Sequence, residues 1–126
     1  MKQLKGRINW VSDIFDYIGQ GFTPKNDPYR HYSARISNAI VSEDMIEFYV
    51  EPHKVEGEFY SFKVNLLNIR SNIFKGKVYL EDSKHIWGEV ECELYSNSKK
   101  NLIHGRWHEF DDEEECLYSF IIVLEK

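Results

Sequence analysis

One short pattern occurs four times in the chain: an apolar residue, any residue, glycine, any residue and a second apolar residue. The copies are LKGRI at 4–8, FKGKV at 74–78, IWGEV at 86–90 and IHGRW at 103–107. In each copy the glycine lies on the apolar face of a period-two alternation, which is typical of a β-strand. Glycine weakens a strand interior and is used where a strand bends sharply or approaches another backbone closely. The pattern therefore predicts a curled sheet with Gly6, Gly76, Gly88 and Gly105 on its concave face.

The composition limits the architecture to one domain. The 126 residues are 42% hydrophobic and 15% aromatic, which suffices for a single core over residues 1–126. Charged residues make up 29% of the chain, and no apolar run approaches the roughly 18 residues of a membrane span. The formal net charge of −5 disfavours general nucleic-acid binding, which depends on a basic surface that neutralises phosphates.

Alternating apolar runs separated by short polar turns predict eight strands. Their expected ranges are 3–11, 34–42, 45–51, 57–67, 72–81, 85–95, 101–110 and 116–125. The short turns favour antiparallel neighbours in sequence order. The one long connection, 12–33, carries an apolar stripe at helical spacing, which predicts a short helix at 13–19. The expected fold class is all-β: an eight-stranded antiparallel up-and-down barrel with one short helix between its first two strands.

The strand expected at 85–95 has the cleanest alternation. Its inward set is Ile86, Gly88, Val90, Cys92 and Leu94. Its outward set is Trp87, Glu89, Glu91, Glu93 and Tyr95. An exposed indole beside carboxylates can anchor a protein partner, so Trp87, Glu89 and Glu91 form a candidate partner-binding surface. The indole can equally pack under a neighbouring turn.

The meander of eight strands with a helical excursion after the first strand resembles the calycin-like barrels: lipocalins, fatty-acid-binding proteins and avidins. The resemblance covers nearly the whole chain and is one of pattern. The Gly-x-Trp spacing that lipocalins carry near their first strand occurs here at Gly105 and Trp107, whereas the first strand reads GRINW. The resemblance implies a ligand cavity inside the barrel. An eight-stranded barrel can be filled by its own side chains or can hold one small ligand.

A group of cationic and aromatic residues is the first candidate site. Arginine offers a bidentate fork for phosphate or carboxylate, and tyrosine and tryptophan offer stacking faces. The candidate ligand-binding residues are Trp10, Arg30, His31, Tyr32, Arg35 and Trp107. The basic segment can instead be a solvated loop, and Trp10 and Trp107 can simply close an end of the barrel.

The remaining polar residues indicate no metal or catalytic site. His104, Arg106 and His108 share one strand face, and we expect an outer polar row there because the two histidines lie about 13 Å apart by strand rise. The acidic run at 111–115 lacks the spacing of a calcium loop. No nucleophile elbow or phosphate-binding glycine loop is present, which favours a non-enzymatic protein without a cofactor.

The sequence leaves two functions open. The first is a small-ligand-binding barrel for a polar anionic, nucleotide-like molecule. The second is an acidic protein-interaction module with a solid core, such as an immunity or inhibitor protein. The two cysteines, Cys92 and Cys116, match no zinc or redox spacing, and no export signal is present. We therefore expect free buried thiols in a cytoplasmic protein, although a mature secreted chain would look the same. The resemblance to barrels of bacterial defence and to phage-encoded inhibitors implies a bacterial or phage origin.

Overall fold

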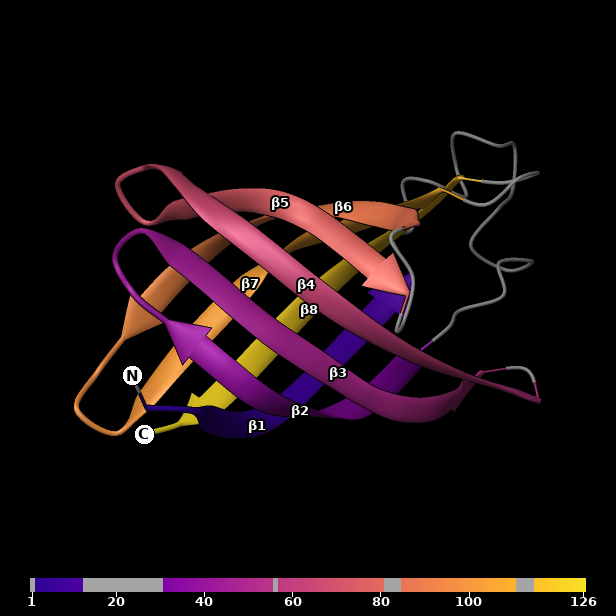
Figure 1. Cartoon of the computed structure of the whole chain (residues 1–126), viewed down its shortest axis with the longest axis horizontal. Helices are drawn as coiled ribbons and strands as arrows, with labels where there is room; N and C mark the ends of the chain where they lie inside the picture. Colours follow the sequence, from indigo (N-terminus) through magenta and orange to yellow (C-terminus); the bar gives the residue numbers. More distant parts are fainter. Residues whose placement is uncertain (1, 13–30, 56, 81–84, 111–114) are drawn as a thin grey trace.

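The computed structural model describes residues 2–12, 31–55, 57–80, 85–110 and 115–126. These residues form eight strands in one closed antiparallel barrel, in which each strand pairs with the next along the chain and β8 pairs back with β1. Figure 1 shows β3 and β4 crossing the near wall and β7 and β8 crossing the far wall. The predicted all-β up-and-down barrel is confirmed. The predicted helix at 13–19 lies outside the described residues.

The strands follow the predicted order but differ in their ends. Their bounds are β1 Leu4–Ser12, β2 His31–Val41, β3 Met45–Val55, β4 Glu58–Arg70, β5 Ile73–Leu80, β6 Ile86–Ser96, β7 Lys100–Phe110 and β8 Glu115–Glu125. The largest differences are that β2 begins three residues early, β3 continues four residues past Glu51 and β4 continues three residues past Leu67. β2 begins at His31 because that residue pairs with Val11 of β1.

The four repeated glycines lie where neighbouring backbones come very close. A Cβ atom on Gly6 would lie 1.9 Å from the carbonyl oxygen of Val123 on β8, across the pair of strands that closes the barrel. A Cβ on Gly76 would lie 1.9 Å from the carbonyl oxygen of Asn65 on β4. Moving either oxygen away would be energetically costly, because each belongs to the backbone of a paired strand. Close backbone approach therefore explains the repeated pattern.

Two β-bulges change the inward and outward alternation at one end of the barrel. Between Val50 and His53, β3 has one residue more than β4 opposite it. This irregularity accommodates Pro52, which has no N–H for the ladder, and it brings His53 opposite the half-buried Tyr60. A strict alternation would have put Pro52 on the inner face.

The second bulge corrects the prediction for Trp87. β6 has an extra residue at Trp87, because Val78 pairs with Gly88 whereas Tyr79 pairs with Ile86. The side chain of Trp87 consequently packs against the core, and Ile86 is 43% exposed. The sequence alternation predicted the reverse for both residues, and it was wrong because a bulge lets two successive residues occupy the same face.

The interior is one continuous apolar core with two chemically different ends. Every strand contributes buried side chains to it. The end next to the chain termini (Figure 1) is mostly aliphatic, with Leu4, Leu66, Ile103 and Leu124 beside Phe74. The opposite end carries most of the buried rings and is called the aromatic end below. Its members are Trp10, Tyr32, His53, Tyr60, Phe62, Trp87, Trp107, Tyr118 and Phe120.

We expect Gly76→Ala to destabilise the barrel by about 1–3 kcal/mol or more, because its Cβ would force β4 and β5 apart. Lys75→Ala is the matched control, since Lys75 is the exposed neighbour of Gly76 on β5. Urea unfolding followed by circular dichroism measures both. A Gly76→Ala variant as stable as Lys75→Ala would show that close approach does not require glycine there.

Because of Cys92, we expect the free energy of unfolding to depend on pH in the alkaline range. Its thiol is free and buried, and burial, aided by Glu91 and Glu93, raises its pKa from 9.0 to about 12. The folded protein therefore keeps a proton that the unfolded chain loses above pH 9, so stability falls as pH rises from 9 towards 12.

The expected loss from this one group is about 1.4 kcal/mol per pH unit within that range. Cys92→Ala should remove this part of the slope, whatever its effect on stability at pH 7. Denaturant titrations at several alkaline pH values measure both slopes, and equal slopes for wild type and variant would contradict the expectation.

Candidate functional site: the aromatic end of the barrel

Four rings of the aromatic end form a closed circuit of contacts. The Trp10 ring centroid lies 5.2 Å from that of His53 and 6.5 Å from that of Trp107. The Phe62 ring lies 5.7 Å from both of the same rings. His53 and Trp107 thus occupy opposite corners, and each contacts both Trp10 and Phe62. The two indole planes of Trp10 and Trp107 are parallel to within 9°, at the long end of the usual spacing of stacked rings.

Further rings extend this circuit towards neighbouring strands. Tyr32 lies 5.4 Å from Trp10, and Trp87 lies 6.5 Å from Phe62. All three tryptophans of the chain therefore belong to the aromatic end. They come from β1, β6 and β7, which only barrel closure brings together.

Three buried polar atoms of the aromatic end have no hydrogen-bond partner among the described residues. They are Nε1 of Trp87, Nε1 of Trp107 and Nε2 of His53. The two indole nitrogens can only donate a hydrogen bond. Trp107 is only 4% exposed. An unsatisfied buried donor or acceptor costs about 1–3 kcal/mol. Three such atoms therefore lie in one cluster of rings.

The hydrogen bond of the other ring nitrogen of His53, Nδ1, determines whether Nε2 donates or accepts. Nδ1 lies 2.9 Å from the backbone carbonyl oxygen of Glu51. A carbonyl oxygen only accepts hydrogen bonds, so Nδ1 carries the proton and donates it. In the neutral ring, Nε2 is then an acceptor with a free lone pair. Sequence reasoning missed His53. Pro52 was the available signal, because a proline within a barrel strand requires a bulge.

The predicted ligand-binding residues fall into two groups. Trp10, Tyr32 and Trp107 come together inside the aromatic end. His31 and Arg35 lie on the outer surface, and both are exposed. Arg30 lies outside the described residues. Because the barrel wall separates the two groups, the inner aromatic residues and Arg35 do not face a common ligand inside the barrel.

Arg35 instead has a cationic neighbour. It pairs in register with Arg7 on β1, and both side chains are exposed. Like charges placed directly opposite each other on a sheet destabilise it. The single-strand patterns did not indicate this pairing, because it depends on the register of β1 against β2.

The predicted acidic surface is flanked by cations. In register, Glu89 lies between Lys77 and His108, and Glu91 lies between Lys75 and Arg106. Lys77 forms a hydrogen-bonded ion pair with Glu89. The hydrogen bond from Lys77 lowers the pKa of Glu89.

The next glutamate on the same row has a histidine neighbour. The Oε2 atom of Glu93 lies 3.8 Å from Nε2 of His104. The predicted outer position of His104, Arg106 and His108 is confirmed, with His108 half-buried. The glutamates are thus part of a mixed ladder of charges.

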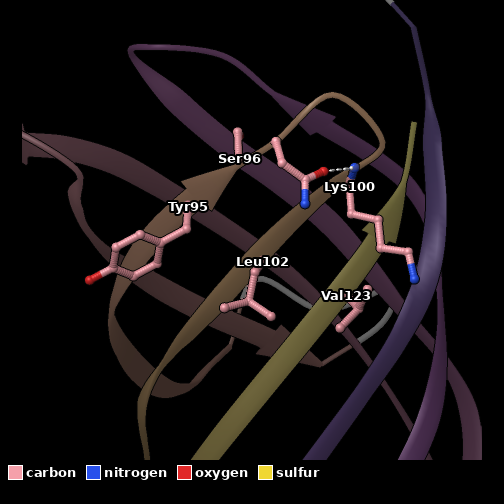
Figure 2. A pocket seen from close by; sticks show the side chains of 6 residues that line it. Tyr95, Ser96, Lys100, Leu102 and Val123 are labelled. Carbon is pink, nitrogen blue, oxygen red and sulfur yellow. Dashed lines mark hydrogen bonds between the residues drawn. The ribbon is translucent and has the colours of Figure 1, made fainter.

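A shallow depression of about 390 Å³ lies on the outer surface at the opposite end (Figure 2). Figure 2 shows Tyr95, Leu102 and Val123 along it, from β6, β7 and β8. The backbone N–H of Lys100 donates to Oδ1 of Asn97 at 2.8 Å in the adjoining turn. Lys100 and Trp107 are seven residues apart on one strand, or about 23 Å. The depression is therefore separate from the aromatic end.

No protein-family model matches the chain, and a search of curated proteins finds no significant match. The class of the protein is therefore defined by its geometry: a closed eight-stranded antiparallel barrel, consistent with a calycin-like fold. Within the described ranges, no helix has the length and apolar character needed to cross a membrane. The same residues contain no cluster of three or more side chains suited to hold a metal ion.

We expect Lys77→Met to raise the pKa of Glu89 towards its ordinary value, because the hydrogen bond from Lys77 is the largest cause of its lowering. Lys63→Met on β4 is the control, since Lys63 also points outward but does not pair with Glu89. Carboxyl ¹³C NMR titration measures the pKa. An unchanged Glu89 titration would mean that the acidic row does not depend on its lysine neighbours.

Proposed function

We propose that the protein is a non-enzymatic barrel that binds a small, planar, polar molecule at its aromatic end. The observation that carries this proposal is the pair of buried indole N–H groups of Trp87 and Trp107, which have no acceptor among the described residues. Buried indole N–H groups normally have a partner. A ligand with acceptor atoms would supply those partners and remove an energetic cost of the folded state.

The surrounding rings favour a flat ligand. The faces of Trp10, Tyr32 and Phe62 offer apolar, polarisable surface, and aromatic stacking adds about 0.5–1.5 kcal/mol per pair beyond area burial. A flexible fatty chain would gain from the apolar area but would leave both indole N–H groups unsatisfied. Ligand sites generally combine apolar walls with a few placed polar groups, as this end does.

An anionic group on the ligand is the second part of the proposal. Arg30 directly precedes the first residue of β2, the strand that carries Tyr32. We assign the anionic contact to Arg30, and a nucleotide-like molecule would combine a stacking base with such a group. Arg35 is exposed on the outer wall and serves as the matched comparison.

The alternative, an acidic protein-interaction module, has less support. Glu89 is held in an ion pair with Lys77, and Trp87 packs against the core. A partner-binding surface built on Trp87, Glu89 and Glu91 would need the indole to leave the aromatic end. A cytoplasmic location remains part of our proposal, supported by the free thiol of Cys92.

Intrinsic fluorescence tests the proposal directly, because all three tryptophans belong to the aromatic end. We expect at least one member of a panel of nucleobases, nucleotides, cyclic nucleotides and fatty acids to change the emission and to release heat in calorimetry. Trp107→Phe keeps an aromatic ring but removes the N–H donor, and we expect it to weaken binding by about tenfold or more.

Two arginine variants complete the experiment. Arg30→Ala should weaken the binding of anionic ligands, whereas Arg35→Ala should leave it unchanged because Arg35 faces outward. Equal weakening by Arg30→Ala and Arg35→Ala would refute the assignment of the anionic contact. A panel in which no member changes the emission or releases heat would refute the proposed function itself.

A further inference from the structure

The circuit of four rings places one acceptor and one donor at opposite corners. Trp107 brings a buried N–H that can only donate, and the neutral ring of His53 brings a buried lone pair at Nε2 that accepts. Both rings contact Trp10 and Phe62, so the two polar atoms belong to one circuit of four rings. A single ligand edge that pairs with both atoms must therefore carry one hydrogen-bond donor and one acceptor.

A ligand group that carries only acceptors or only donors can form a hydrogen bond with just one of the two atoms. A carboxylate or phosphate offers only lone pairs, which would repel the Nε2 lone pair of a neutral His53 ring. An ammonium group offers only donors, which would oppose the N–H of Trp107. Asn101 is the one buried polar or charged residue that the described chain contains, and it lies at the opposite end. No buried cation among the described residues is therefore available to hold an anion between the rings.

A ligand edge with a donor and an acceptor satisfies both corners. We propose that the aromatic end recognises a planar heterocycle through an edge of the cyclic-amide type, whose N–H donates to His53 Nε2 and whose carbonyl oxygen accepts from Trp107 Nε1. This inference rests on the proposed function of the aromatic end. It adds a ligand class, heterocyclic lactams, and assigns to His53 a role in specificity.

Three probes of similar size separate hydrogen bonding from stacking. 2-Quinolinone carries the complete lactam edge, 1-methyl-2-quinolinone lacks the N–H, and naphthalene offers only a stacking face. Calorimetric titration and tryptophan emission report binding of each. We expect wild type to bind 2-quinolinone at least tenfold more tightly than its N-methyl analogue, because the analogue leaves the acceptor of His53 unpaired. Naphthalene should bind more weakly than 2-quinolinone.

Two variants at position 53 test the role of the histidine. His53→Phe keeps a ring but removes the acceptor, so the preference for 2-quinolinone over the N-methyl analogue should disappear. His53→Gln supplies an amide oxygen and should retain part of the preference. If the variants fold poorly, ¹⁵N NMR of wild type gives the same information. The Nε2 signal of His53 should shift on addition of 2-quinolinone and not on addition of the N-methyl analogue.

The outcomes distinguish this inference from the proposed function. If wild type binds all three probes equally, the aromatic end is a stacking site and the lactam assignment is wrong, while the proposed function stands. If His53→Phe still prefers 2-quinolinone over the N-methyl analogue and the Nε2 signal of wild type does not move, His53 does not form the proposed hydrogen bond with the ligand. If neither these probes nor the panel of nucleobases, nucleotides and fatty acids binds, the proposed function fails as well.

Discussion

Close approach of paired backbones is the constraint on which the rest of this structure depends. At Gly6 the backbone of β1 comes so near to that of β8 that any Cβ would meet the carbonyl oxygen of Val123. This contact lies on the strand pair that closes the barrel. Closure removes every sheet edge, so each residue faces either the core or the outside. It also brings β1, β6 and β7 to one interior, where their tryptophans meet.

The regular part of this architecture could be predicted from the sequence. Period-two alternation located eight strands, and the glycines indicated close approach before any register was known. Trp10 and Trp107 share the phase of Gly6 and Gly105, which predicts that both indoles face the interior. These inferences succeeded because each depends on the local geometry of a single strand.

Properties that depend on how two strands pair could not be predicted from single-strand patterns. A glutamate row looks acidic when β6 is read alone, but the register sets Lys77 on one side of Glu89 and His108 on the other. Arg35 looked like part of a ligand site because it follows Tyr32 in sequence. The odd spacing between the two puts them on opposite faces, and the register sets Arg35 beside Arg7. Electrostatic partners on a sheet depend on long-range pairing.

Two of the places where alternation failed are also the places that give the aromatic end its chemistry. One bulge turns His53 inward beside Pro52, and the other adds Trp87 to the inner face beside Gly88. Bulges commonly re-aim side chains near functional sites. Regular strands would have placed only one of the three unpartnered polar atoms of the aromatic end, Nε1 of Trp107, inside the barrel. The irregular strands add an acceptor and a second donor, both buried, at the cost of unsatisfied hydrogen bonds in the described residues. Unsatisfied buried polar atoms reduce stability, so their presence at the aromatic end is better explained by function, and we propose the binding site there.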